Sequence, residues 1–251
     1  MRRTTRFATA LAGAAALFAG AALPAAAQTL SLDLGAGGST TGRIVQLVAL
    51  LTVLSLAPSI LVMVTSFTRI VIVLSFLRSA MGVQQTPPNA VLVSLALFLT
   101  AFVMGPTLER SYQEGIVPLM EETVSEEEAF KRTIAPIKDF MLKHVREQDL
   151  SLFMELAQTP QVATPAETPL RSLIPAFMIS ELRRAFEIGF LLFLPFVVID
   201  MVVASILMSM GMMMLPPVMI SLPFKLIFFV LVDGWYLVAG SLVQSYGPVG
   251  G

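Results

Sequence analysis

Three ionisable residues inside apolar segments are the first candidates for chemistry in this chain. Asp200 and Asp233 stand in two apolar stretches, and Lys225 lies between them in the sequence. Two carboxylates on neighbouring membrane helices can activate a water molecule, as in an intramembrane aspartyl protease. If the two helices turn near Met213, however, the carboxylates differ in height by about 10 Å, which is too far to share a proton. We therefore predict that the protein is not an enzyme.

An ion pair is the second kind of chemistry open to these residues. In a hairpin that turns near Met213, Asp200 and Lys225 lie at the same height, so we expect their side chains to approach within one helical turn. Pairing removes the cost of an isolated charge in an apolar setting. In the two alternatives, Lys225 extends to the cytosolic edge of the membrane, or it pairs with Glu181 of a neighbouring chain.

Four further charges have the spacing of ion pairs along one helix. Glu181 and Arg184 are three residues apart, and Arg183 and Glu187 are four apart, which places each pair on one helical face. One interpretation is neutralisation along the helix, with Glu181 and Arg184 as a structural pair. The other interpretation gives the same charges a role between subunits.

The sequence contains few candidate ligands for metal or redox chemistry. The chain contains no Cys and a single His. The absence of Cys excludes disulfides, thiolate metal sites, iron–sulfur clusters and Cys nucleophiles. We expect no metal and no cofactor. The single His144 could serve as a proton relay, although its simpler role is as one member of an amphipathic stripe.

That stripe joins His144 to Ile137, Phe140, Met141 and Val145, which repeat at helical spacing on one face. An amphipathic helix needs a surface that covers its apolar face. We predict that Phe140 and Met141 form a subunit interface with copies of the same segment. Cover from within the same chain is the alternative.

The elements that position these residues are apolar helices. Apolar residues make up 56% of the 251 residues and charged residues 13%, against about 25% charged residues in soluble domains. The formal net charge is −1, which offers no basic surface to nucleic acid. Four stretches approach or exceed the length of a membrane-spanning helix: 44–64, 90–108, 186–207 and 218–243.

These stretches predict an all-α membrane protein with two long helical hairpins and a helical periplasmic domain between them, assembling into a helical oligomer. The predicted limits are 43–108 for the first hairpin, 109–174 for the periplasmic domain, 175–246 for the second hairpin and 247–251 for a C-terminal tail. Within the first hairpin, Thr65 to Asn89 is expected to be a cytosolic connection. Arg69 and Arg78, with no acid beside them, satisfy the positive-inside rule there.

The middle segment carries its own start and stop signals. Ser125 and Glu128 have the spacing of a capping box, so a helix is expected to begin there. Pro136 is expected to interrupt it. A loop that cannot stay helical is then predicted by four prolines: Pro160, Pro165, Pro169 and Pro175.

The N-terminus has the pattern of a secretory signal. Three Arg residues among the first six precede an apolar stretch and a run of small residues that ends at Ala27. This order predicts a cleaved signal peptide at 1–27, followed by a periplasmic N-terminal segment at 28–42. An uncleaved anchor helix and a twin-arginine signal are the alternatives.

Prolines and charges within the apolar stretches indicate an obligate assembly. Such groups usually face protein or a water-filled cavity, and neighbouring chains can satisfy the backbone that prolines leave unpaired. The residues concerned are Pro58, Pro106, Pro195, Pro223, Asp200, Lys225 and Asp233.

The turn of the second hairpin is rich in methionine, because seven of the 15 methionines fall between Met201 and Met219. Methionine is flexible and conforms to many surfaces. In a single chain, core filling at the tip of the hairpin is the simpler interpretation. In a symmetric ring, such turns would meet on the axis and close a pore to water and ions. The residues of this predicted gasket are Met208, Met210, Met212, Met213 and Met214.

Four sequence stretches resemble the FliP family of flagellar type III export-gate proteins, and the likeness runs from about Arg43 to Tyr246. Two are the signature stretches of that family, and two others are similar to it. They are Pro175–Gly189 (PAFMISELRRAFEIG), Pro223–Trp235 (PFKLIFFVLVDGW), Thr65–Leu74 (TSFTRIVIVL) and Gly211–Pro217 (GMMMLPP).

The resemblance implies a homopentamer that joins FliQ and FliR in a conical helical gate, with FlhB and FlhA as further export components. It implies that unfolded flagellar subunits pass through this gate from the cytoplasm, at the inner membrane within the flagellar basal body. It also implies that the methionine-rich loop acts as a gasket and that the protein is no enzyme. The homologous gate of a virulence injectisome and a small-solute transporter are the alternative functions. The predicted signal peptide favours the flagellar member.

Overall fold

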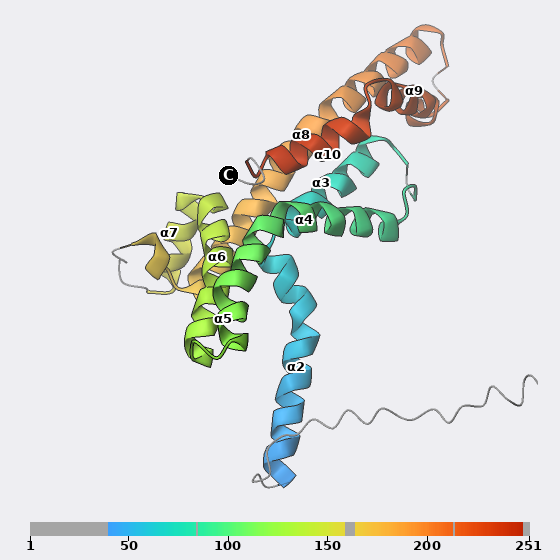
Figure 1. Cartoon of the computed structure of the whole chain (residues 1–251). Coiled ribbons are helices and arrows are strands. Elements are labelled where there is room, and N and C mark those ends of the chain that lie inside the picture. Colours follow the sequence, from blue (N-terminus) through green and yellow to red (C-terminus); the bar gives the residue numbers. More distant parts are fainter. Residues whose placement is uncertain (1–39, 84, 159–163, 213, 248–251) are drawn as a thin grey trace, which may run out of the picture. The chain divides into compact units, whose positions relative to one another are not determined.

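The computed structural model describes residues 40–83, 85–158, 164–212 and 214–247 (Figure 1). Every regular element within these ranges is helical. The elements are α2 (Thr40–Val64), α3 (Phe67–Ala80), α4 (Asn89–Ser111), the π-helical turn η1 (Tyr112–Ile116), α5 (Val117–Met120), α6 (Glu126–His144), α7 (Glu147–Leu156), the 3-10 turn η2 (Pro165–Glu167), α8 (Leu170–Ser209), α9 (Pro217–Leu231) and α10 (Gly234–Gln244). The predicted signal peptide at 1–27 lies outside the described residues.

The chain divides into two compact units, 1–54 and 55–251. The described part of the first unit is the beginning of α2, an apolar helix that starts at Thr40. The predicted periplasmic segment at 28–42 is therefore described only where this helix begins. All of the other helices belong to the second unit, which contains the core.

Helix α3 is the centre of that core. It packs against α8 and α4, and its side chains Ile70, Val73, Leu74 and Leu77 are almost fully buried. Most of the Thr65 to Asn89 segment, predicted to connect the two spans of the first hairpin, is therefore a core helix. Apolar residues recur on every face of this segment, and a helix that is apolar all round is buried inside a protein.

Helix α8 is continuous for 40 residues and carries much of the second hairpin. It begins at Leu170, so the predicted domain boundary between residues 174 and 175 falls inside a helix. Pro175 was expected to belong to a loop, and this expectation is wrong. Pro175 lies in the second turn of α8, where the helix gives up one backbone hydrogen bond without ending.

The segment between the hairpins is helical, as expected, but its limits differ. Helix α4 continues through η1 into α5, so the boundary predicted at residue 108 also falls inside a helix. Ser125 caps α6 by accepting from the Glu128 N–H at 3.4 Å, as the capping box predicts, while the Glu128 carboxylate accepts from Arg132. Pro136 does not interrupt α6, because its side chain is fully buried and packing holds the helix together around it.

The last predicted span, 218–243, is broken into two helices. Helices α9 and α10 meet at an angle of 63°. Between them Asp233 adopts a φ of 50°, in the left-handed region. The second hairpin therefore has one long arm, α8, and a returning arm with an elbow.

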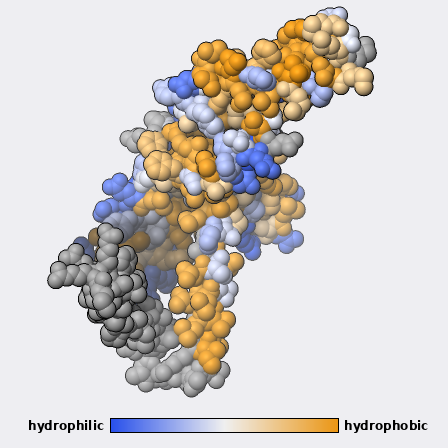
Figure 2. Space-filling view, turned by 90° about the vertical axis from the view of Figure 1, so that its right-hand side faces the viewer, coloured by the Kyte–Doolittle hydropathy of each residue, from blue (hydrophilic) through white to orange (hydrophobic). Residues whose placement is uncertain are grey.

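Length and composition mark two helical segments as able to cross a membrane, Asn89–Met120 and Leu170–Ser209. The bent pair α9 and α10 also passes as a single broken span, and so does α2 if its two parts are joined. Only 11% of the most apolar window of Leu170–Ser209 is buried inside the chain. Hydrophobic residues accordingly cover much of the visible face in Figure 2. Such a surface requires lipid or other chains as cover.

Candidate functional site: two buried ion pairs and a methionine-rich turn

The first buried ion pair joins α3 to α8. Arg69 is 2% exposed and Glu181 is fully buried. The Nε of Arg69 donates to Glu181 Oε2 at 2.9 Å, and Nη2 donates to Oε1, so the pair is bidentate. Planar, two-point pairing of this kind is the strongest geometry available to a guanidinium and a carboxylate.

The C-terminal end of the described chain completes this site. Arg69 Nη1 donates to the hydroxyl of Ser245 at 2.9 Å and to its carbonyl at 3.3 Å. The Tyr246 hydroxyl donates to Glu181 Oε2 and lies 3.3 Å from the Ser66 carbonyl. The Arg69 guanidinium also lies 3.8 Å from the centroid of the Tyr246 ring, in a cation–π contact. Burial and the neighbouring Glu181 carboxylate raise the pKa of Tyr246 well above its ordinary value.

The expected pair of Glu181 with Arg184 is absent. Glu181 faces α3, where Arg69 neutralises it, whereas Arg184 has an exposed side chain and lies 3.6 Å from Glu187. The pair of Arg183 with Glu187 has the predicted spacing and is present at 2.9 Å. From helical spacing alone, Arg184 was a possible partner of Glu181. The packing of α3 on α8 instead places the buried Arg69 beside Glu181.

Phe140 and Met141 are covered by their own chain. They are 9% and 1% exposed and belong to the main core, so the predicted subunit interface at these residues is corrected to the intramolecular alternative. The Phe140 ring stacks on Tyr246 at 5.8 Å and meets Phe177 at 6.0 Å. Little apolar surface remains on these two side chains for another subunit.

His144 lies against the same aromatic group. Its ring is 4.7 Å from Phe140 and 5.1 Å from Tyr246, measured between centroids. Burial, followed by the charges of Arg69, Lys143 and Arg184, lowers the pKa of His144 to about 4. The imidazole is therefore neutral near pH 7 and acts as a packing group.

The second ion pair, buried at Lys225 and partly buried at Asp200, joins α8 to α9. Lys225 Nζ lies 2.6 Å from Asp200 Oδ2, so the predicted approach of these side chains is present within one chain. Ser221 donates to the other oxygen of Asp200. Lys225 also donates to the Ala80 carbonyl, at the end of α3, at 3.3 Å. The pair thus ties three helices together, and Lys225 does not extend into solvent, because it is 3% exposed.

The methionine-rich turn follows directly from these helices. Helix α8 ends at Ser209, Gly211 bends the backbone with a φ of 75°, and Pro216 precedes the first residue of α9, Pro217. Glycine readily adopts this positive φ, and the two prolines restrict the backbone where α9 begins. The exposed fractions of the described methionines are 57% for Met208, 55% for Met210, 45% for Met212 and 98% for Met214. Met213 lies outside the described residues.

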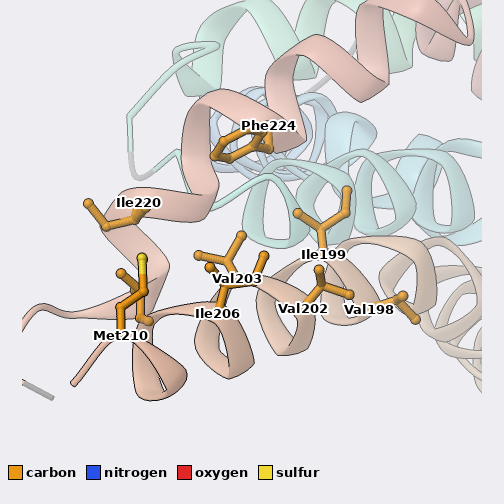
Figure 3. Close-up of a pocket in the computed structure, with 9 residues that line it drawn as sticks. Val198, Ile199, Val202, Val203, Ile206, Met210, Ile220 and Phe224 are labelled. Carbon is orange, nitrogen blue, oxygen red and sulfur yellow. The ribbon is translucent and has the colours of Figure 1, made fainter. Parts of the chain in front are cut away.

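An apolar groove runs along the hairpin beside this turn (Figure 3). It has a volume of about 500 Å³. Its wall comes from α8, where Val198, Val202, Ile206 and Met210 stand in a row, and from Ile220 and Phe224 of α9 (Figure 3). Every side chain that lines it is apolar, so the groove offers nothing to hold a polar solute.

Sequence reasoning missed Arg69, Ser221 and Tyr246 as members of these sites. Arg69 carried a usable signal, because an Arg inside an apolar, helix-forming stretch needs a buried partner. Tyr246 and Ser221 carried none, since their contacts cross 180 and 21 residues of sequence. Among the described residues, no three His, Asp or Glu side chains gather closely enough to hold a metal ion.

The architecture and the sites define a class: an all-α membrane protein whose apolar surface is open to lipid or partners and whose charges pair in its interior. The model of the FliP family matches residues 50–242, and the chain belongs to this family. It is a component of the flagellar export apparatus.

Its relatives are similar over most of their length. A flagellar biosynthetic protein FliP of Caulobacter vibrioides is 65% identical over 92% of this chain and 88% of the relative. The protein of the same description from Bacillus subtilis is 57% identical over 80% of this chain and 91% of the relative. That of Aquifex aeolicus is 53% identical over 86% and 91%, respectively.

Proposed function

We propose that this chain is a channel-forming subunit of the flagellar export gate and that its methionine-rich turn is the gasket of the channel. The observation that carries the proposal is the exposure of apolar side chains at the tip of a hairpin. Met214 is 98% exposed and Met208 is 57% exposed. A tip of this kind has no cover within its own chain, and in a ring of subunits the tips cover one another.

The chemistry of methionine suits this role. Its side chain is unbranched, flexible and polarizable, and it adapts to irregular surfaces. A ring of methionines excludes water and ions when they touch one another, and it yields to a polypeptide of any sequence. Gly211 and the Pro216–Pro217 pair fix where the backbone leaves and enters the helices, so the turn presents its side chains at a defined position.

The assembly that we propose around this turn is a homopentamer with FliQ and FliR, and with FlhB and FlhA as further partners. Its cargo is unfolded flagellar subunits. We place it in the inner membrane within the flagellar basal body, with the 109–174 segment on the periplasmic side and no catalytic role for the chain. The exposed apolar surface of α8 supports an assembly of this kind, because a chain alone in water cannot leave it uncovered.

Replacement of Met212, Met213 and Met214 by Ala tests the gasket. The complex should still assemble, because the described side chains of this set are exposed and contribute little to the fold of the single chain. The membrane should become permeable to small ions, measured as conductance of reconstituted complexes or of whole cells.

Met120→Ala is the matched control, because Met120 is 72% exposed but lies in α5, outside the turn. It should leave conductance unchanged. A fully assembled triple variant that conducts no more than the control would falsify the gasket role.

A small-solute transporter finds less support than the gate. The groove between α8 and α9 is lined only by apolar side chains, and both buried ion pairs have their charges occupied by partners within the chain. A site for a polar solute needs a few accessible polar groups that fix its orientation.

A further inference from the structure

Helices α9 and α10 meet at an elbow, and the side chains of Phe229 and Trp235 pack tightly inside it. The bend is 63°, and Asp233 adopts the left-handed backbone conformation that residues other than glycine rarely adopt. A Cβ on Gly234 would lie 2.1 Å from the Phe229 ring. The same ring meets Trp235 edge-on at 5.4 Å. The elbow is thus a defined joint between two rigid arms.

Each arm of the elbow is held by a different ion pair. The α9 arm is held by Lys225, which binds Asp200 of α8 and the Ala80 carbonyl of α3. The α10 arm is held at its far end by Tyr246, whose hydroxyl reaches Glu181 of α8 and the Ser66 carbonyl. The two anchors share no residue.

The apolar contacts of α10 alone are sparse. Val238 and Leu242 are its buried apolar side chains, whereas Tyr236 is 74% and Leu237 is 53% exposed. A hollow of about 350 Å³, lined by Phe98, Leu99 and Phe102 of α4, lies beside α10. Because α10 does not fill this space, the polar contacts at its end add to its sparse packing.

We propose that Tyr246, with the Arg69–Glu181 pair, is a latch that holds α10 against the core and that its release frees α10 alone. The α9 arm keeps its own anchor through Lys225, so the methionine-rich turn keeps its place. The C-terminal helix can then be repositioned during assembly without disturbing the turn. This inference concerns the chain itself and does not depend on the gasket.

Single cysteines test the latch, because the chain has no Cys of its own. Leu242→Cys reports on α10, since Leu242 is 1% exposed, and Leu207→Cys reports on α8 beside α9, since Leu207 is 6% exposed. The reaction of each with a maleimide is followed in the full chain in mild detergent. The latch is weakened by Tyr246→Phe, which keeps the ring and its contact with Arg69 and removes the hydroxyl bound to Glu181.

Tyr246→Phe should accelerate labelling of Leu242→Cys by about tenfold or more, the change expected when a hydrogen bond to a charged group is lost. Labelling of Leu207→Cys should stay as it is. The matched control is Tyr236→Phe, which removes an exposed hydroxyl from the same helix and should change neither rate. Equal labelling of Leu242→Cys with and without the Tyr246 hydroxyl overturns the latch. Equal acceleration at both positions also overturns it, because the variant would then loosen the whole fold.

Hydrogen exchange of the backbone amides, measured in the chain without an introduced Cys, controls for any perturbation of the fold by Leu242→Cys itself. With Tyr246→Phe, exchange should rise in residues 238–246 and remain unchanged in residues 217–231. A rise of equal size in both segments contradicts the separation of the two arms.

Discussion

The Tyr246 cluster and the methionine-rich turn are opposites in chemistry and in exposure. In the cluster, Arg69, Glu181 and Tyr246 are polar and buried. At the turn, Met208 and Met214 are apolar and exposed. A soluble protein arranges these two classes the other way round. The cluster is complete within one chain, since every charge has its partner, whereas the turn is complete only when something outside the chain covers it.

This difference predicts where substitutions act. Changes in the cluster should alter the stability of the single chain, because they leave buried groups without partners. Changes at the turn should leave that stability almost unaltered and act only in the assembly.

Arg69→Met should have the largest effect. It leaves the fully buried Glu181 without its cation, and loss of one partner of a buried ion pair costs about 3–5 kcal/mol. The measurement is the free energy of unfolding in mild detergent. The double variant Arg69→Met with Glu181→Leu should recover much of the loss, since no buried charge is then left alone. If the double variant is less stable than the single one, the uncompensated charge is not the cause.

Gly189→Ala should disturb the contact of α3 with α8. A Cβ at this position would lie 2.6 Å from the Phe76 ring and 3.2 Å from its Cβ. Overpacking of this kind costs about 1–3 kcal/mol. Gly105→Ala is the matched control, because Gly105 is also helical and nothing lies within 4 Å of its added Cβ. The control should be neutral or slightly stabilising, and equal losses in both variants would point to the backbone instead of the Phe76 contact.

Acid should weaken the cluster through His144. The pKa of this imidazole falls to about 4 in the folded chain, from 6.5, mainly because of burial. Between these values the unfolded chain binds more protons, so the folded state loses stability as the pH falls from 6.5 to 4, and no more below that. Because the ring is only partly buried, we expect a loss of about 1–2 kcal/mol.

The measurement is the pH dependence of unfolding, compared with His144→Gln. His144 is the only His of the chain, so the variant removes the whole imidazole contribution. Its stability should vary less between pH 6.5 and 4 than that of the native sequence. Identical profiles would show that carboxylates, and not His144, govern the acid response.

Met214→Ala should have the smallest effect on the single chain. Its side chain is 98% exposed, and substitutions at such positions change stability by about 0.5 kcal/mol or less. Thermal unfolding of the isolated chain in detergent is the measurement. A loss above about 2 kcal/mol would mean that the turn is part of the fold of one chain, and the contrast between the two regions would then fail.

The elements that could be predicted from the sequence are those whose cause is local. Length and mean apolarity indicated the helices, and Ser125 and Glu128 indicated the start of α6. The approach of Lys225 to Asp200 also followed from local geometry, because a hairpin with a known turn fixes which residues stand at the same height. Each of these inferences needed no knowledge of a distant segment.

The errors share one physical reason, which is that packing overrides local preference. Pro136 and Pro175 stay inside helices because neighbouring helices hold the backbone in place. The 65–89 segment is mostly a core helix, because its apolar residues find cover on α8 and α4. Rules based on neighbouring residues could not account for the stability gained by this packing, because the covering residues lie far away in the sequence.

The sequence by itself determined that this protein is helical, belongs in or beside a membrane and keeps its few interior charges in pairs. Those properties follow from composition and periodicity, which can be read from each segment without knowledge of the rest of the chain. Only the tertiary structure decided which charges pair. Glu181 pairs with Arg69 and not with Arg184. The two-point contact with Arg69 lies inside the core and excludes water, whereas a contact between exposed side chains along one helix does not exclude water. The C-terminal Tyr246 joined that pair for the same reason, since the fold alone brings residues 69, 181 and 246 together.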